Sequence, residues 1–295
     1  MNPALLLCVA VSSVAADEKL FQAEVIPAAG FTAGIEGPAC DAAGNVYAVS
    51  FKERENIGRV TPDGQVGLFV TLPNKSCGNG IVFDRAGMMY VADYTNHNVL
   101  RIDPQTKTVS VFAHEPKMNQ PNDLAIAADG TIYASDPSWA KSTGQIWKVS
   151  PKGEVSLFAP EMGTTNGIEV SPDGKTLYVN ESVQRNVWSF DLTADKPQKK
   201  LLKKYGDYGF DGMRSDVDGN LYITRHGKGT VVKLSPSGEQ LQEIDVLGKN
   251  PTNLCFGGPD GLTVYVTDAE HTRLVKFRVD RPGLAWQRWQ EAAKQ

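Results

Sequence analysis

The sequence predicts an all-β protein that folds as a six-bladed β-propeller, with four antiparallel strands in each blade and a central channel. Three observations support this fold class. One sequence pattern recurs six times along the 295-residue chain. Within each copy, apolar residues alternate with polar ones at the period of a β-strand. Tight turns that contain Asp-Gly, Pro-Asp-Gly or Pro-Ser-Gly separate the runs, as hairpins require.

The first half of each repeat predicts the two inner strands of a blade. Successive copies are 43, 43, 44, 45 and 41 residues apart, and four short strands repeated every 40 to 50 residues or so, about the length of one blade, are typical of a propeller. The six copies begin at Glu36 (EGPACDAAGNVYAVS), Asn79 (NGIVFDRAGMMYVAD), Asn122 (NDLAIAADGTIYASD), Asn166 (NGIEVSPDGKTLYVN), Asp211 (DGMRSDVDGNLYIT) and Thr252 (TNLCFGGPDGLTVYVT).

The second half of each repeat predicts the two outer strands. It reads IGRVTPDGQVGLF, VLRIDPQTKTVSVF, IWKVSPKGEVSLF, VWSFDL and VVKLSPSGEQLQEI in the first five copies, and LVKFRVD closes the last. The last copy therefore lacks an outer strand. We expect residues Phe21 to Ile26 (FQAEVI) to supply that strand from the N-terminal side, which would close the ring and cover an exposed sheet edge.

The chain divides into three expected segments: a signal peptide at 1–16, the propeller at 17–285 and a polar C-terminal tail at 286–295. The signal peptide is indicated by the apolar run from Ala4 to Val14 and by the small residues Val14-Ala15-Ala16 before Asp17. It predicts a secreted or periplasmic protein. No later stretch is apolar enough to cross a bilayer, so no membrane contact is expected after cleavage.

Composition excludes one class of partner and limits the cysteine chemistry. A net charge of −4 and a pI near 5.7 argue against nucleic acid, which needs a basic face. Once the signal peptide is removed, Cys40, Cys77 and Cys255 remain, with no CxxC pair. This pattern favours buried free thiols over a zinc site and permits at most one disulfide. Oligomeric state stays open.

The first residues of the six copies are candidates for a metal site. The first strand of each propeller blade lines the central channel, so these residues should form a ring at one mouth. All six carry side-chain oxygens, and two are carboxylates. Two buried carboxylates that face each other repel unless a cation neutralises them. Carboxylate and amide ligands suit Ca²⁺, while Mg²⁺, Mn²⁺ and Zn²⁺ stay open. The alternative is a polar, water-filled channel.

The loop after the second strand of each blade should frame the same mouth. These loops carry Ser50-Phe51-Lys52, Asp93-Tyr94, Asp136-Pro137-Ser138-Trp139, Glu181-Ser182, Arg225-His226 and Asp268 through His271. Acids, aromatic residues and histidines gathered at a metal site predict a substrate pocket. We therefore expect Asn79, Asn122, Trp139, His226 and His271 to contact substrate, the alternative for each being a solvated loop residue.

These motifs resemble the gluconolactonase and senescence-marker-protein (regucalcin-like) family of metal-dependent lactonases. The resemblance is carried by EGP, PND, NGI and FDG at these spacings, within PNDLAIAADGTIYASDP, TNGIEVSPDGKTLYVNES, FDGMRSDVDGNLYIT and PTNLCFGGPDGLTVYVT. It implies that Glu36, Asn166 and Asp211 bind the metal, and that Asn122 contacts substrate or completes the metal sphere. Sugar-lactone hydrolases of the family often carry Arg two residues before that Asn, where this chain has Gln120.

The mechanism expected from this resemblance is metal-assisted hydrolysis of a lactone. Asp211 would act as general base toward a water molecule, and Asn122 would orient the carbonyl group. Two alternatives remain. One is a phosphotriesterase or other ester hydrolase that uses the same residues. The other is a non-catalytic propeller, like NHL-repeat proteins, whose channel would lack the combination of Glu, Asn and Asp.

Overall fold

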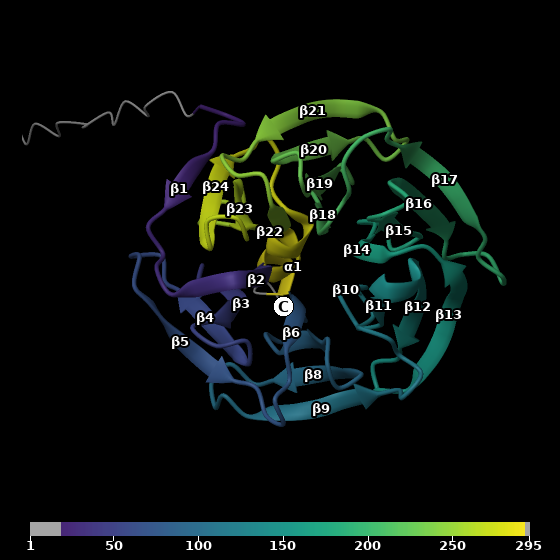
Figure 1. Ribbon diagram of the computed structural model, residues 1–295, viewed down its shortest axis with the longest axis horizontal. Coiled ribbons are helices and arrows are strands. Elements are labelled where there is room, and N and C mark those ends of the chain that lie inside the picture. The colour runs from purple at the N-terminus through teal and green to yellow at the C-terminus, as the bar shows by residue number, and fades with distance from the viewer. Residues whose placement is uncertain (1–18, 293–295) are drawn as a thin grey trace, which may run out of the picture.

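The computed structural model describes residues 19–292, which form six antiparallel four-stranded sheets arranged around one axis (Figure 1). The predicted six-bladed propeller is confirmed. The expected signal peptide, residues 1–16, lies outside the described residues. Within residues 19–292 no helix is both long and apolar enough to cross a membrane.

Each blade uses four strands that are adjacent in the chain, except the last. The first blade consists of β2 (Phe31–Cys40), β3 (Val46–Phe51), β4 (Asn56–Val60) and β5 (Val66–Thr71), and the second of β6 (Gly78–Phe83), β7 (Met89–Asp93), β8 (Asn98–Ile102) and β9 (Val109–His114). The third consists of β10 (Leu124–Ile126), β11 (Ile132–Ser138), β12 (Thr143–Val149) and β13 (Val155–Met162), and the fourth of β14 (Thr165–Val170), β15 (Thr176–Glu181), β16 (Asn186–Asp191) and β17 (Lys199–Lys204). The fifth consists of β18 (Met213–Ser215), β19 (Leu221–Arg225), β20 (Thr230–Leu234) and β21 (Gln240–Asp245), and the last of β22 (Pro251–Gly257), β23 (Thr263–Asp268), β24 (Arg273–Arg278) and the N-terminal strand β1 (Glu24–Ile26).

The N-terminal strand closes the ring as predicted, although it is shorter than expected. Strand β1 (Glu24–Ile26) pairs antiparallel with β24, and Val25 lies opposite Val275. Before it, the backbone N–H of Phe21 donates a hydrogen bond to the carbonyl of Arg278 at 2.8 Å. The first and last described segments of the propeller are thus joined within one sheet.

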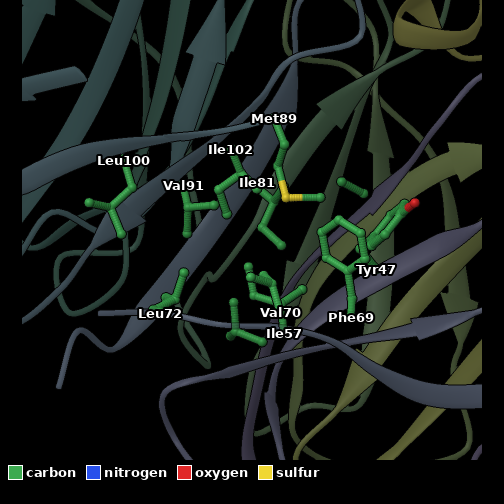
Figure 2. Close-up of a cluster of buried hydrophobic side chains, with 12 residues drawn as sticks. Tyr47, Ile57, Phe69, Val70, Leu72, Ile81, Met89, Val91, Leu100 and Ile102 are labelled. Carbon is green, nitrogen blue, oxygen red and sulfur yellow. The ribbon is translucent and has the colours of Figure 1, made fainter. Parts of the chain in front are cut away.

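Apolar side chains from neighbouring blades pack face to face and form the core. Between the first two blades, Tyr47, Ile57 and Phe69 meet Ile81 and Met89, all with at most 3% of their surface exposed (Figure 2). The inner strands are buried on both sides, as in β3, whereas outer strands such as β9 consist mostly of exposed or half-buried residues. Burial of these side chains is the main force that holds the blades together.

The C-terminal segment differs from the expected polar tail. Residues Leu284–Ala292 form a helix, α1, which lies over one end of the central channel (Figure 1). Trp289 packs against Phe83 with ring centroids 5.8 Å apart, and Arg288 donates a hydrogen bond to the carbonyl of Ile126 at 2.6 Å. A helix of nine residues is too short to show a clear helical period, which explains why the sequence did not reveal it.

Candidate metal centre at one mouth of the channel

The six predicted ring residues come together at one end of the channel, because the inner strands begin next to one another. The backbone N–H of Gly80 donates to the carbonyl of Asn122 at 2.7 Å, that of Gly167 to Asp211 at 3.0 Å, and that of Gly212 to Thr252 at 2.7 Å. The close approach explains the glycine after Glu36: a Cβ on Gly37 would lie only 1.9 Å from the carbonyl oxygen of Asn79. The ring of first residues is therefore confirmed as a geometric feature.

Four buried oxygen atoms of this ring have no hydrogen-bond partner. They are Glu36 Oε2, Asn79 Oδ1, Asn122 Oδ1 and Asn166 Oδ1. Buried polar atoms are nearly always paired, so a cluster of unpaired acceptors needs an explanation. Oxygen acceptors from carboxylates and amides are the donor set that hard divalent cations use. The residues present at this mouth therefore fit a bound divalent metal ion.

The amide of Asn166 is oriented by its neighbours. Its Nδ2 donates to Ser182 Oγ at 3.1 Å, and Ser182 Oγ in turn donates to the carbonyl of Phe210 at 2.6 Å. Because Ser182 engages the amide nitrogen, the amide oxygen of Asn166 is the atom left without a partner. Such outer hydrogen bonds fix the orientation of metal ligands in proteins.

The surroundings of the two ring carboxylates, Glu36 and Asp211, disfavour their charged forms. Burial raises the pKa of Glu36 to about 7, against hydrogen bonds from Thr252 and Asn253 that lower it. Burial, with the nearby charge of Glu36 as a second cause, raises the pKa of Asp211 well above its usual value, while a hydrogen bond with Asn166 lowers it. Asp211 as a residue nevertheless keeps some accessible surface. A cation between the two acids would favour their charged forms.

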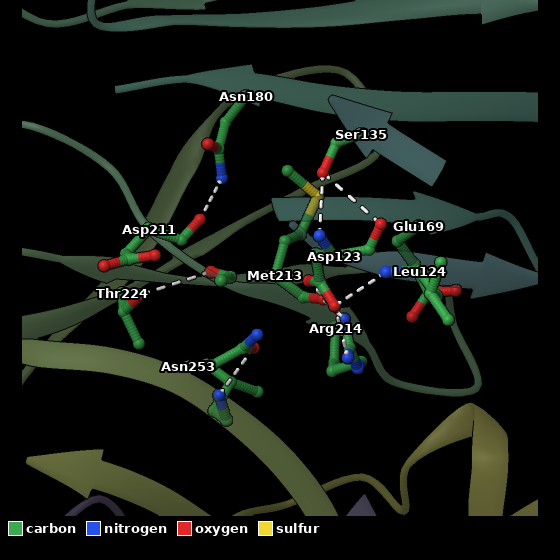
Figure 3. Close-up of polar contacts among 12 residues, drawn as sticks. Asp123, Leu124, Ser135, Glu169, Asn180, Asp211, Met213, Arg214, Thr224 and Asn253 are labelled. Atoms are coloured by element: carbon green, nitrogen blue, oxygen red, sulfur yellow. Dashed lines mark hydrogen bonds and ion pairs between the residues drawn. The ribbon is translucent and has the colours of Figure 1, made fainter. Parts of the chain in front are cut away.

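A buried ion pair lies beneath the ring. The Arg214 guanidinium donates to both carboxylate oxygens of Asp123 at 2.8 and 2.9 Å (Figure 3). Asn253 Nδ2 donates to Glu36 Oε1 at 3.1 Å. The carboxylates of Glu36, Asp211 and Asp123 carry three negative charges when ionised, and Arg214 carries one positive charge. Over these four residues, with every acid ionised, the balance is minus two, which one divalent cation would neutralise. The pair of Asp123 and Arg214 was missed by sequence reasoning, because its members lie 91 residues apart.

The acids that end the second strands have a structural role instead of the predicted place in a substrate pocket. Asp93, Asp136, Glu181 and Asp268 are at most 2% exposed. Asp136 accepts hydrogen bonds from the backbone N–H groups of Asn119 and Gln120 and from Trp147 Nε1. Asp93 accepts likewise from Ser76, and Glu181 from the backbone N–H of Gly163, so these three acids hold the loop that arrives from the preceding blade. Asp268 instead accepts from His271 and Arg273. The sequence showed the repeated acid but could not show the loop folded onto it.

Blade five replaces this acid with a base. Arg225 is fully buried, its guanidinium lies 4.1 Å from the ring centroid of Tyr205, and it donates to Asp207 at 2.8 Å. Here the base, Arg225, ends the strand and the acid, Asp207, lies on the loop. Their ion pair holds the loop that leads through Phe210 into Asp211. The position of the central carboxylate therefore depends on this arginine as well as on strand pairing.

The predicted substrate residues outside the ring lie on the loops that follow the second strands. Trp139 begins a short 3₁₀ turn (Trp139–Lys141) and lies beside the hydroxyl of Tyr94. His226 is exposed, although surrounding protein lowers its pKa. His271 is exposed and bonded to Asp268 Oδ2 at 2.8 Å. Their contact with substrate stays a prediction.

A second group of potential metal ligands, Asp268, Glu270 and His271, lies in one of these loops. Its members already have other partners. Asp268 Oδ2 accepts from His271 and from Arg273, and Glu270 accepts from the backbone N–H of Lys249. This group is therefore not the candidate metal centre, which lies in the channel.

Fold and site together define a class: six-bladed propellers in which oxygen-bearing side chains begin the inner strands at one mouth of the channel. Residues 36–270 match the family described as SMP-30/Gluconolactonase/LRE-like region. The chain belongs to this family.

Relatives and solved structures agree with that assignment. The chain is 27% identical to a gluconolactonase of Zymomonas mobilis over 82% of its own length and 78% of the relative. It is also 27% identical to regucalcin of Xenopus laevis over 64% of its length and 68% of the relative. The fold resembles that of a calcium-binding regucalcin from Agrobacterium tumefaciens, with a TM-score of 0.74, 21% identity, and coverage of 84% of this chain and 91% of that one.

Proposed function

We propose that the protein is a metal-dependent lactonase, a carboxylic ester hydrolase that opens a cyclic ester with a water molecule. The observation that carries the proposal is the set of four buried, unpartnered oxygens beside Asp211, a carboxyl whose pKa is raised by burial and by the nearby charge of Glu36. The gluconolactonase name of the Zymomonas relative supports the class of substrate.

Glu36, Asn166 and Asp211 would hold the metal ion, with Asn122 completing its sphere. Ca²⁺ is the expected ion, since all the donors are oxygens, and the Agrobacterium protein of the same fold is described as calcium-binding. When bound, a divalent ion supplies Lewis-acid polarisation of the ester carbonyl and lowers the pKa of a water molecule.

Residues of the chain carry the other roles in the proposed reaction. Asp211 is the general base, because it is the carboxylate of the ring that remains partly accessible and a raised pKa makes it a better proton acceptor near neutral pH. Asn122 would orient the carbonyl with its amide. The buried ion pair of Asp123 and Arg214 adds no net charge beside these groups.

One residue bears on the choice of lactone. Gln120 stands where sugar-lactone hydrolases of the family often carry arginine, and its backbone N–H is bonded to Asp136 at 2.7 Å. A neutral amide here cannot supply the charge-assisted hydrogen bonds of a guanidinium. The substrate class is therefore proposed as lactones in general, with sugar-acid lactones as the first members to test.

The test is a substrate panel on chelated protein that is re-supplied with Ca²⁺, Zn²⁺, Mg²⁺ or Mn²⁺ in turn. The substrates are a sugar-acid lactone, an aliphatic lactone, an acyclic ester and a phosphotriester. We expect proton release from at least one lactone only when a metal is added. Turnover of the phosphotriester alone would favour the alternative hydrolase, and no turnover with any metal would favour a binding propeller.

A further inference from the structure

Two cysteines from opposite ends of the chain meet inside the propeller. Cys40 ends β2 in the first blade, and Cys255 lies in β22 of the last blade. Their Sγ atoms are 3.4 Å apart, although the residues are separated by 215 positions in the sequence. At most 9% of the surface of either residue is exposed.

The contact lies at the seam where the ring closes. In the same seam, Thr252 Oγ1 donates to the carbonyl of Ile35 at 2.9 Å and Asn253 donates to Glu36. Gly257 makes room for the pair, since a Cβ at that position would lie 2.4 Å from Cys40 Sγ. A covalent bond here would therefore join the first blade to the last beneath the candidate metal centre.

Cys77 provides an internal comparison. It lies on the loop before β6, only half-buried, and its Sγ is 3.7 Å from the Arg54 guanidinium. It shares neither the seam nor the contact between thiols. A bond that formed by chance oxidation of exposed cysteines would involve Cys77 rather than the buried pair.

We propose that Cys40 and Cys255 form a disulfide that locks the first blade to the last. The oxidant is a small-molecule disulfide such as glutathione disulfide. One cysteine thiolate attacks it, forming a mixed disulfide and releasing one glutathione thiol. The second thiolate then attacks the mixed disulfide, forming the bond between Cys40 and Cys255 and releasing the second glutathione. Two cysteine protons and two electrons leave the protein, and both glutathiones are reduced.

The folded protein should undergo this reaction slowly. The hydrogen bond with Cys255, together with burial, raises the pKa of the Cys40 thiol, and the thiolate is the reactive form. Both cysteines line a cavity of about 320 Å³ beneath α1, at the end of the channel away from the metal mouth. We therefore expect the bond to form while the chain folds. The oxidising compartment expected from the N-terminal signal would favour it.

The experiment refolds the reduced full-length chain in a glutathione redox buffer, alkylates free thiols, and maps tryptic fragments without reduction. We expect fragment 20–52, which contains Cys40, to be joined to fragment 250–273, which contains Cys255. Fragment 76–85, which contains Cys77, should be alkylated. The melting temperature should rise by roughly 10 °C over the reduced protein, because the bond closes a very long loop. Reductant should reverse the rise.

Matched variants separate the pair from other cysteines. Cys77→Ala should keep both the linked fragment and the rise in melting temperature, whereas Cys40→Ala should lose both. Alkylation of Cys40 and Cys255 after oxidative refolding of the wild type would overturn the proposal, as would a bond from either of them to Cys8 or Cys77. The fragment map of the wild type decides the matter even if Cys40→Ala does not fold.

Discussion

At the scale of single residues, the orientation of the Asn166 amide shows how a neighbouring side chain positions a candidate metal ligand. Ser182 engages Asn166 Nδ2 and leaves Oδ1 without a partner. If that oxygen is a metal ligand, Ser182→Ala should weaken metal binding by roughly 10- to 100-fold, as outer-sphere changes commonly do. Calorimetric titration measures this change. Ser156→Ala, on an exposed part of β13, is the control. Equal affinities in the two variants would contradict the role of Ser182.

A second residue-scale prediction concerns the general base. Asp211→Asn keeps an oxygen and the side-chain shape but removes the basic carboxylate. We expect turnover to fall by roughly 10² to 10⁴, the range that general base catalysis contributes, while some metal binding persists. The exposed Asp63→Asn is the control, because it removes the same charge far from the channel. A variant of Asp211 with wild-type kcat would exclude this residue as the base.

Glu169 gives a prediction about pH and stability. Burial raises its pKa, against the charges of Arg214 and Arg288 and against backbone N–H groups, all of which lower it. Because the folded state holds this proton at pH values where the unfolded chain has released it, stability falls as pH rises above the unfolded pKa of about 4.5. The side chain of the Glu169→Gln variant does not titrate, so this loss of stability with rising pH is absent from the variant. The melting temperature of the variant, minus that of the wild type, should therefore increase with pH above about 4.5. A difference that is flat or falls would contradict this account.

At the scale of secondary-structure elements, α1 connects the second and third blades. It contacts Phe83 through Trp289 and the carbonyl of Ile126 through Arg288, at the end of the channel away from the ring. Trp289→Ala should destabilise the fold by about 1 to 2 kcal/mol, since the side chain is half-buried and stacks edge-to-face. Thermal melting checks this, with the exposed Gln290→Ala as control. Loss of hydrolysis without loss of stability would mean that α1 also acts on the site.

The elements also show what sequence patterns can and cannot predict. The inner strands and the ring of first residues were predictable, because a repeat places equivalent residues at equivalent positions. The pairing of Asp123 with Arg214 was not, since a repeat gives the layer of a side chain but not its partner across the channel. The sequence predicts a pocket at the acids that end the second strands, because the loops that fold onto acids such as Asp136 leave no sequence signal.

At the scale of the whole molecule, ring closure and the central channel depend on each other. Strand β1 completes the last blade, and the seam between β2 and β22 brings Glu36 to Asn253. The six inner strands then present one concentrated set of oxygens at one mouth. A charge balance of minus two is unfavourable in an enclosed channel, so the fold is expected to be more stable with a divalent cation than without one.

The most direct test of this account is a calorimetric titration of Ca²⁺ into chelated wild type and chelated Asp211→Ala, with melting temperatures measured alongside. We predict that the wild type binds one ion per chain. At a hundredfold excess over the dissociation constant, binding should stabilise it by about 3 kcal/mol, which is a rise of roughly 5 °C for a domain of this size. Asp211→Ala should show little binding and little rise. No binding by the wild type of any of the four candidate ions, or equal binding by both proteins, would contradict the metal centre in the channel.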